Sequence, residues 1–559
     1  MAVDYRPIPI GVEDFKAMID KGYYYVDKTM FIRDILDNKS YVNLYTRPRR
    51  FGKTLNMSML QYYFEKTDED NSYLFEGLNI SKQGEKYKQY QGRFPVISLS
   101  FKGMKQKSFD DVFKIFKNMI SKEFNRHTCI LEQNKLSPLD SRYFNQICDG
   151  SAEDFVYFTS LKLLSDCLYS CYEEKVVILI DEYDVPLESA YFNGYYDDMV
   201  NLIRSVFESA LKTNKSLEFG VLTGCLRISK ESIFTGLNNF DVYSVVNNNC
   251  SSYFGFTEHE VTDMTEYFDI SENNDALKEW YDGYQFGENE IYNPWSILKY
   301  VKAVLNKDKT PLLAYWSNTS SNDIIHKLIK EGDTDNKAIV ENLINGSMIS
   351  KPLHEDITYR NIDVNTDYIW SFLLHTGYLK AVRTYLVRNT LYADMIIPNR
   401  EIVSIYENTI MQWFNEKLVL TPREDLFRSV ISGDTLQFEE ILLDWLEDTI
   451  SYYDTKENYY HGFLSGLLSG FKGYQTMSNR ENGTGRTDIV LLEQRRHLVA
   501  VIIEIKVADE FAHLEQKCDE ALRQIEEKQY DMALKKECYK KIIKYGVAFN
   551  KKSCMVKMA

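Results

Sequence analysis

The stretch RPRRFGKT, residues 47–54, ends as a phosphate-binding loop ends, but it begins with Arg47 where the usual pattern has glycine. In such a loop the backbone N–H groups surround the β-phosphate, and the N-terminus of the following helix attracts negative charge. Gly52 would let the chain approach the phosphate, Lys53 would neutralise the β- and γ-oxygens, and the Thr54 hydroxyl would bind Mg²⁺. The stretch therefore predicts a site for a nucleoside triphosphate such as ATP.

The residues on either side of this loop have the order that such a site requires. Residues 41–46 are rich in β-formers, and residues 55–64 have the apolar spacing of an amphipathic helix. A chance Gly-Lys-Thr in a long chain is the alternative, because the first glycine of the pattern is missing. The arginines of the loop would add positive charge that glycine cannot supply. The predicted nucleotide contacts in the loop are Arg47, Arg49, Arg50, Phe51, Gly52, Lys53 and Thr54.

A second stretch, VVILIDE at residues 176–182, is an apolar run of buried-strand length that ends in two carboxylates. A central parallel strand is apolar on both faces, and ligands bind at its carboxyl end. Asp181 would hold Mg²⁺ and Glu182 would polarise the attacking water, as in a Walker B strand. The alternative is a core strand followed by an acidic turn. The loop upstream and a further strand downstream favour the Walker B interpretation.

That further strand is LEFGVLT at residues 217–223. Its polar end, Thr223, suits a sensor of the γ-phosphate, and Arg227 would stabilise charge that develops during phosphoryl transfer. A surface arginine is an equally good interpretation of Arg227. The candidate strands and the helical stretches between them predict an α/β fold with a parallel sheet.

Length and composition narrow the class of protein. The chain has 559 residues, more than one core normally spans, and 44% hydrophobic residues with 14% aromatics suffice for packed cores. No apolar run reaches transmembrane length, and residues 1–15 lack the regions of a signal peptide, so we expect a cytoplasmic protein without a membrane partner. Nine cysteines without a C-x-x-C pair argue against a disulfide framework or a structural zinc site.

The last hundred residues hold a second group of charged side chains. Asp488 begins the apolar stretch DIVLL, and Glu504 and Lys506 lie two residues apart in the strand-like VIIEIK, so both project on one face. If the two strands form a hairpin, Asp488 and Glu504 converge on one divalent cation, Mg²⁺ or Mn²⁺, with Lys506 beside the metal-bound water. This arrangement suits phosphodiester hydrolysis.

Three further residues accompany this group. Glu457, on a predicted helix over residues 456–468, would add a third carboxylate to the metal, and Gln524 and Tyr530 on a later helix would orient substrate or water. A chance E-x-K is the alternative in a chain that is 26% charged. The charges, however, interrupt a strand of otherwise unbroken hydrophobicity, where unpaired ionised groups are expensive, and this favours a functional site.

Two resemblances follow from these motifs. Residues 1–255 resemble the AAA-ATPase-like family through PIGVEDFKAMIDKGYYYVDKTMFI, RPRRFGKT, LIDEYD and VLTGCLRISKESIFTGLNN, so an arginine at the start of the loop is part of the resemblance. Residues 458–549 resemble the PD-(D/E)XK nuclease-like domain through YYHGFLSGLL, SNRENGTGRTDIVL, VIIEIK and ALRQIEEKQY, with Thr487 at the proline of the superfamily name. By position, the resemblance implies nucleotide and Mg²⁺ roles for Lys53, Thr54, Asp181 and Glu182, and a nuclease core of Asp488, Glu504 and Lys506.

The sequence as a whole predicts an α/β protein in three parts: a P-loop domain over residues 1–255, a mostly helical region over 256–450, and a restriction-endonuclease-like domain over 451–559. The favoured hypothesis is an ATPase whose nuclease domain cleaves DNA or RNA under nucleotide control. The alternative is a nucleotide-controlled switch whose nuclease-like domain binds nucleic acid or a partner without cutting. Assembly into a homo-oligomeric ring is compatible with this class of ATPase. The net charge of −16 argues against a chain that coats nucleic acid, although a cleft can still carry positive potential.

Overall fold

The computed structural model describes residues 5–228, 240–308, 311–316, 339–340, 342–364, 367–409, 424–447, 457–469, 471, 473–482, 485–494 and 498–559. The chain divides into two compact units. The first comprises Met1–Ser320 with Met348–Ser404, and the second comprises Ser321–Ser347 with Ile405–Ala559. Most of the region predicted to be a helical middle part therefore belongs to the first unit.

A five-stranded parallel sheet forms the centre of the first unit. Its strands lie in the order β2-β3-β4-β1-β5, and every neighbouring pair is parallel. The strands are β1 (Val42–Thr46), β2 (Val96–Ser100), β3 (Val176–Asp181), β4 (Leu217–Gly224) and β5 (Phe240–Tyr243). Every residue of β1 and β3 is buried, as apolar central strands require. Because β4 lies between β1 and β3, the three predicted motifs end side by side at one edge of the sheet.

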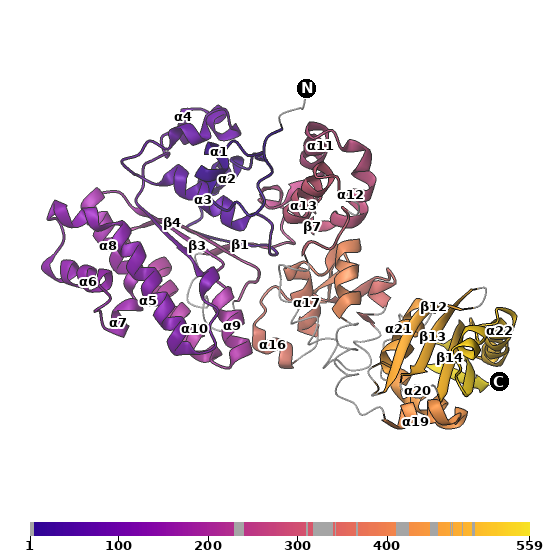
Figure 1. Ribbon diagram of the computed structural model, residues 1–559. Helices are drawn as coiled ribbons and strands as arrows, with labels where there is room; N and C mark the ends of the chain where they lie inside the picture. The colour runs from indigo at the N-terminus through magenta and orange to yellow at the C-terminus, as the bar shows by residue number, and fades with distance from the viewer. Residues whose placement is uncertain are drawn as a thin grey trace. The chain divides into compact units, whose positions relative to one another are not determined.

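Helices cover both faces of this sheet (Figure 1). One side carries α1 (Phe15–Asp20), α2 (Met30–Asn38) and α3 (Lys53–Phe64). The other side carries α5 (Phe109–Arg126), α8 (Ser160–Tyr172), α9 (Val185–Asn193) and α10 (Tyr196–Phe207), while α6 (Pro138–Cys148) packs against α5 and α8. The long span between the loop and the Walker B strand is thus filled by helices, as the sequence predicts.

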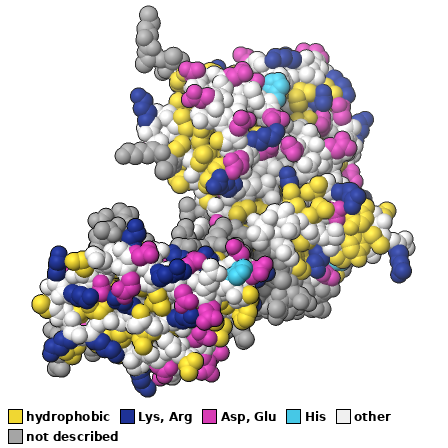
Figure 2. All heavy atoms as spheres, turned by 90° about the vertical axis from the view of Figure 1, so that its right-hand side faces the viewer, with side chains coloured by type: hydrophobic (Ala, Val, Ile, Leu, Met, Phe, Trp, Pro, Cys, Tyr) yellow, Lys and Arg dark blue, Asp and Glu magenta, His cyan; other side chains and the backbone are white. Residues whose placement is uncertain are grey.

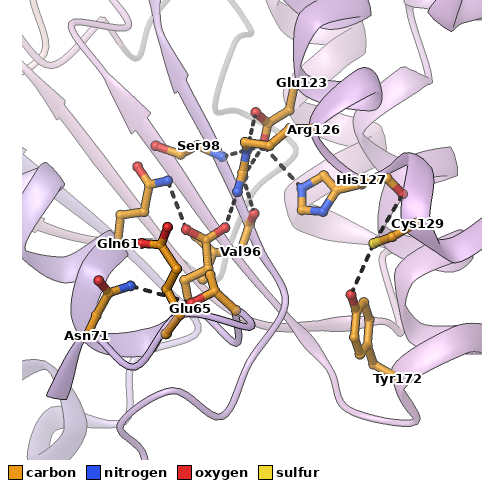
Figure 3. Close-up of polar contacts among 12 residues, drawn as sticks. Gln61, Glu65, Asn71, Val96, Ser98, Glu123, Arg126, His127, Cys129 and Tyr172 are labelled. Atoms are coloured by element: carbon orange, nitrogen blue, oxygen red, sulfur yellow. Dashed lines mark hydrogen bonds and ion pairs between the residues drawn. The ribbon is translucent and has the colours of Figure 1, made fainter.

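A network of charged groups attaches α5 to the sheet (Figure 3). Arg126 forms ion pairs with Glu65 and Glu123 and donates to the Val96 carbonyl at 2.6 Å. A Glu123 oxygen accepts the backbone N–H of Ser98 at 2.9 Å. Burial alone would raise the pKa of Glu123, but hydrogen bonds from His127 and Arg126 lower this pKa to about 2. The network joins the end of α3, strand β2 and helix α5.

The rest of the first unit is helical with two small antiparallel sheets. Its helices include α11 (Glu258–Tyr267), α12 (Asn274–Tyr281), α13 (Pro294–Leu305), α16 (Tyr359–Val364) and α17 (Asp367–Thr376). One sheet has the order β6-β8-β7, formed by Phe256–Thr257, Asn289–Tyr292 and Tyr284–Phe286. The other has the order β10-β11-β9, formed by Lys380–Val387, Thr390–Ile396 and Ile349–Pro352. Helices dominate as the sequence predicts, and the two short sheets are an addition to that prediction.

The second unit contains a mixed five-stranded sheet in the order β12-β13-β14-β15-β16. Its strands are Tyr474–Asn482, Gly485–Glu493, Val499–Val507, Lys541–Asn550 and Ser553–Met558. Only β14 and β15 pair in parallel. The helices are α19 (Glu424–Ser432), α20 (Thr435–Glu447), α21 (Glu457–Leu467), α22 (Leu514–Glu527) and α23 (Met532–Lys536).

The two faces of this second sheet are covered by different helices (Figure 1). On one face, Tyr460 of α21 stacks on Phe549 of β15 with ring centroids 4.3 Å apart. On the other face, Ile525 of α22 packs with Val490 and Ile502 in a buried cluster. Side chains of a strand point alternately to its two faces, and this is the period of two that the sequence of β14 predicts. No helix in the described ranges is both long enough and apolar enough to cross a membrane.

Close packing between α22 and β15 gives a test of this unit. A Cβ at Gly546 would lie 2.5 Å from the Cys518 carbonyl oxygen and 3.0 Å from Leu522 Cγ. Since the nearest atom is backbone and cannot rotate away, we expect Gly546→Ala to lower the free energy of unfolding by about 1–3 kcal/mol. Thermal and urea unfolding measure the change.

The control is Gly103→Ala, because a Cβ at Gly103 meets no atom within 4 Å. Equal stability of Gly546→Ala and wild type would show that α22 does not approach the sheet this closely.

Candidate functional site

The loop between β1 and α3 turns through two residues of left-handed backbone directly before the helix. Arg50 and Gly52 have φ angles of 70° and 83°, and α3 begins at Lys53. A Cβ at Gly52 would meet no atom within 4 Å. A side chain would therefore have room at this position. Glycine is favoured there because the backbone is left-handed, a conformation that other residues rarely adopt. The turn aims the N-terminus of α3 at the space beside the loop, where an anion is stabilised.

The ammonium of Lys53 lies within the curve of the loop. Lys53 is buried, and Nζ donates to the carbonyl oxygens of Arg47 and Pro48, each at 2.9 Å. Cys225 Sγ lies 3.7 Å from the same nitrogen. The lysine thus holds two peptide groups of the loop in place and keeps a positive charge at its centre.

Asp181 joins the loop to the two strands beside it. Its Oδ2 accepts from Thr54 Oγ1 at 2.7 Å, and its Oδ1 accepts from Thr223 Oγ1 at 2.5 Å. Burial raises the pKa of Asp181 while these hydroxyl groups oppose the rise, and the pKa stays above its ordinary value. The hydroxyl and the carboxylate that a Mg²⁺ would bind are therefore already in contact, so the residues present fit that ion.

Glu182 occupies a different position from Asp181. Its φ angle of 53° turns the chain at the end of β3, and the half-buried side chain lines a cavity of about 300 Å³ together with residues 49–56. Thr223 Oγ1 accepts the Glu182 backbone N–H at 3.4 Å. Thus Asp181 and Thr223 lie behind the cavity wall, whereas the Glu182 carboxylate is at its surface.

The residues after Glu182 are bonded to the residues after β4. Asp184 Oδ2 accepts the backbone N–H groups of Cys225 and Leu226 at 2.7 and 3.0 Å. The Tyr183 hydroxyl donates to the Leu226 carbonyl at 2.5 Å and accepts the Ile228 N–H at 3.0 Å. The segment that follows β3 is consequently hydrogen-bonded to the segment that follows β4.

The three arginines of the loop have different environments. Arg47 is fully buried; Nη1 donates to the Thr46 and Tyr243 carbonyls at 2.8 and 2.7 Å, and its guanidinium lies about 5 Å from the ring centres of Phe254 and Phe286. Burial lowers the pKa of Arg47 to about 10. Arg47 does not line the cavity. We therefore interpret it as a structural residue, in place of the nucleotide contact that the sequence predicts.

Arg49, Arg50 and Phe51 do line the cavity. Arg49 forms an ion pair with Glu188, and its carbonyl accepts from Trp316 Nε1 at 3.2 Å. The Arg50 guanidinium lies 4.5 Å from the ring centre of Trp295. Each arginine that faces the cavity is thus already oriented by a neighbour.

The structure does not bring Arg227 to this cavity. Its Nε lies 3.1 Å from Asp356 Oδ1, and Arg227 is not among the lining residues. This placement favours the interpretation of Arg227 as a paired surface arginine. Three other cations, Lys28, Lys102 and Lys105, line the cavity instead, and Lys102 pairs with Glu13 at 2.5 Å.

A buried carboxylate behind the loop was not predicted from the sequence. Glu401 is fully buried; it accepts from Ser296 Oγ and from the Trp316 backbone N–H, each at 2.9 Å. Burial raises the pKa of Glu401 to about 7. Because Trp316 also bonds to the Arg49 carbonyl, Glu401 is linked to the loop through one tryptophan. Ser296 lies in the aromatic stretch YNPWSI, residues 292–297, and Trp316 lies in YWSN, residues 315–318. These two stretches are the only feature of the sequence that could have pointed to the partners of Glu401.

In the second unit, the predicted nuclease residues do come together. Antiparallel pairing of Ile489 with Ile503 brings the start of β13 beside Glu504. Asp488 Oδ2 accepts the Ile505 backbone N–H at 2.8 Å, and Lys506 Nζ lies 3.6 Å from Glu504 Oε1. The hairpin that the sequence predicts is thus formed by β13 and β14.

The Glu504 carboxylate has an unsatisfied oxygen. Glu504 is 1% exposed, and its Oε2 is a buried atom that has no hydrogen-bond partner among the described residues. Burial and the nearby charge of Asp488 raise the pKa of Glu504 to about 8. A buried carboxylate oxygen without a partner is costly, and a divalent cation between Asp488 and Glu504 would complete it. The residues present therefore fit a metal.

Gln524 and Tyr530 also belong to this group. Gln524 Nε2 donates to Glu504 Oε1 and to the Tyr530 hydroxyl, the latter at 3.3 Å. His461 of α21, which was not predicted, lies with Nε2 2.8 Å from the Asp488 carbonyl oxygen. The side chain of Glu457 lies outside the described residues, and within those residues no three His, Cys, Asp or Glu side chains form a metal-binding group.

Comparison with known families accounts for both groups of residues. Residues 9–234 match the family model described as a predicted AAA-ATPase. Residues 455–559 match the PD-(D/E)XK nuclease superfamily. The chain carries an AAA-ATPase-like domain and a PD-(D/E)XK nuclease-superfamily domain. The loop, Walker B strand and Thr223 lie in the first domain, and Asp488, Glu504 and Lys506 lie in the second.

A relative shares both regions. It is a protein of Azotobacter chroococcum mcd 1 described as "Uncharacterized protein in vnfD 5'region", which is 25% identical over 505 residues. The match covers 87% of this chain and 87% of the relative. Because the unmatched remainder of this chain is shorter than either family match, the similarity includes at least part of the AAA-ATPase-like domain and of the nuclease-superfamily domain.

The buried Glu401 makes the stability of the first unit depend on pH. Its pKa of about 7 lies above the ordinary 4.5, so the folded state holds a proton that the unfolded state releases between these values. Stability should therefore fall as pH rises through this window, by about 3 kcal/mol in all. Glu401→Gln should remove the share of this fall that Glu401 contributes, about 3 kcal/mol, as measured by urea unfolding between pH 4.5 and 7.5.

Glu279→Gln is the matched control, since Glu279 is an exposed residue paired with Arg400. If wild type and Glu401→Gln show the same slope of stability against pH, Glu401 is not the titrating group.

Proposed function

We propose that this chain is an ATP-dependent nucleic-acid enzyme, in which the AAA-ATPase-like domain binds and hydrolyses ATP and the nuclease-superfamily domain cleaves phosphodiester bonds. The observation that carries the proposal is the meeting of Asp488, Glu504 and Lys506 around a buried carboxylate oxygen for which the described part of the chain supplies no partner. A domain that had lost catalysis would have no catalytic reason to keep all three.

In the first domain, the backbone N–H groups at the start of α3 and the ammonium of Lys53 would receive the β- and γ-phosphates. Thr54 and Asp181 would hold Mg²⁺, which neutralises charge on the phosphate oxygens when bound. Glu182, at the cavity surface, would orient the attacking water and accept its proton. Thr223 would fix the Asp181 carboxylate from behind.

In the second domain, Asp488 and Glu504 would hold Mg²⁺ or Mn²⁺, which polarises the scissile phosphate and lowers the pKa of bound water. The Lys506 ammonium, 3.6 Å from Glu504, would stabilise negative charge at the phosphate. Gln524 would keep Glu504 Oε1 fixed and leave Oε2 directed to the site. Glu457 is proposed as a further ligand on the strength of the sequence alone.

The substrate is proposed to be DNA or RNA held by local contacts. Figure 2 shows lysine and arginine side chains interspersed with acidic ones on the face it draws. Such a surface, with a net charge of −16, gives little long-range attraction for a polyanion. Binding would then depend on contacts near the metal site. Homo-oligomeric assembly of the ATPase domain is part of the proposal.

Removing the ammonium of Lys53 tests the ATP site. Lys53→Ala should weaken ATP binding by about tenfold or more, because a charge-assisted contact contributes about 1.5–3 kcal/mol. ATP hydrolysis should be lost as well. Calorimetric titration with ATP and a phosphate-release assay measure both effects.

Lys88→Ala, at an exposed lysine of a short helix outside the cavity, is the control. ATP turnover that persists in Lys53→Ala would refute the assignment of the loop.

Removing the metal ligand or the lysine tests the nuclease site. Asp488→Ala and Lys506→Ala should each reduce Mg²⁺- or Mn²⁺-dependent cleavage by about 100-fold or more while ATP hydrolysis continues. Cleavage is measured on single- and double-stranded DNA and RNA, with and without ATP.

Lys517→Ala is the control, because Lys517 pairs with Glu520 on α22 and does not contact the proposed site. If wild type cleaves none of these substrates with either metal, the nuclease-superfamily domain binds nucleic acid or a partner without cutting.

A further inference from the structure

We infer that Glu401 is a positioning residue for the loop between β1 and α3, and that it acts through Trp316. Glu401 holds the tryptophan, and the indole N–H of the tryptophan holds the Arg49 carbonyl in the middle of the loop. The inference rests on the proposed ATP site and concerns how that site is kept in shape. ATP hydrolysis would then depend on a carboxyl group outside the matched ATPase segment, residues 9–234.

Hydrogen bonds to carbonyl oxygens hold the loop from two sides. From inside, Lys53 Nζ donates to the two carbonyls described above. From outside, Trp316 Nε1 donates to the Arg49 carbonyl at 3.2 Å, and the Gly255 N–H donates to the Phe51 carbonyl at 3.0 Å. The peptide group of the Arg49 carbonyl adjoins one of the peptide groups that Lys53 binds. A shift of the first would therefore also displace the ammonium.

The position of Trp316 is fixed through its backbone and through its ring. Glu401 Oε1 accepts its backbone N–H at 2.9 Å, and its ring centre lies 4.9 Å from that of Tyr378. The Glu401 carboxyl group is held in turn by α13, because Ser296 Oγ lies 2.9 Å from each of its oxygens. The indole N–H is thus directed at the Arg49 carbonyl with little freedom to turn away.

The chain beside Tyr378 packs directly on the loop. A Cβ at Gly377 would lie 3.0 Å from Pro48 Cβ, so the two segments approach as closely as a glycine allows. Trp316 and residues 377–378 together form the surface on which the loop rests. Glu401 fixes the tryptophan within this surface.

Packing alone does not explain a carboxyl group at position 401. Glu401 is fully buried, and within the described residues no cation is paired with it. A buried carboxyl group without a cation lowers stability unless its hydrogen bonds compensate, whereas an apolar side chain of similar size carries no such penalty. The arrangement is explained if the hydrogen bond to Trp316 has a role in the function of the loop.

Trp316→Phe tests this role with a small change. It removes the indole N–H but keeps an aromatic ring beside Tyr378 and the backbone N–H that Glu401 accepts. Trp370→Phe is the matched control, since Trp370 is also fully buried and its Nε1 has no hydrogen-bond partner in the part of the chain that the structure describes. Both changes are made in the full chain, and ATP hydrolysis is measured per ATP bound, so that unfolded protein does not count as lost activity.

Three further variants connect Glu401 to the tryptophan. Glu401→Ala removes the acceptor. Glu401→Gln keeps it, because the amide oxygen can accept the Trp316 N–H while the amide nitrogen donates to Ser296 Oγ. The double variant Glu401→Ala with Trp316→Phe shows whether the two residues act together.

The expected losses are in turnover. Trp316→Phe and Glu401→Ala should each lower kcat for ATP by about tenfold and change KM by less than about threefold, because the N–H groups of α3 still bind phosphate while the ammonium is less well placed. Glu401→Gln and Trp370→Phe should stay within about twofold of wild type, and the double variant within about twofold of Glu401→Ala.

Hydrogen exchange measures the loop without any nucleotide. Amides of residues 47–56 should exchange about threefold faster or more in Trp316→Phe than in wild type, because the outer hydrogen bond that restrains the loop is gone. Trp370→Phe should exchange as wild type does.

Two results would overturn the inference while leaving the loop as the ATP site. One is an unchanged kcat in Trp316→Phe, and the other is a double variant whose loss is the product of the two single losses. If wild type hydrolyses no ATP, the proposed function fails, and unchanged exchange of the loop in Trp316→Phe would then refute the positioning role as well.

Discussion

The contact on which the first unit depends is the one between the Lys53 ammonium and the carbonyl oxygens of Arg47 and Pro48. A buried ammonium is costly unless it is hydrogen-bonded, and these two peptide groups satisfy it within the curve of the loop. The loop in turn fixes where α3 begins and brings Thr54 to Asp181. The position of the groups proposed to bind phosphate thus follows from how one buried charge is satisfied.

Both units place a carboxylate in an environment that disfavours its charge. Asp181 ends a fully buried strand, and Glu504 lies in the buried central part of β14. In each case burial raises the pKa and a polar neighbour holds one oxygen: Thr223 for Asp181, and Gln524 for Glu504. Such a carboxylate is fixed in direction and gains more from a cation than a solvated one does. The two domains therefore use the same physical arrangement on unrelated sheets.

Local patterns in the sequence were sufficient for the motifs. The β-strand period of two predicted that Glu504 and Lys506 share a face, and an apolar run ending in carboxylates predicted β3 with Asp181 at its end. Burial of Arg47 was not predictable, because its two aromatic neighbours, Phe254 and Phe286, lie more than 200 positions along the chain. The hydrogen bonds that connect Glu401 through Trp316 to Arg49 could not be predicted either, because a glutamate in a helical stretch carries no local sign of burial.

The bonds between the ends of β3 and β4 have a mechanical consequence. Asp184 and Tyr183 hold residues 225–228 through four hydrogen bonds, so this segment cannot move independently of the chain that carries Glu182. Any displacement of the chain at Glu182 would therefore be shared by the segment that carries Arg227.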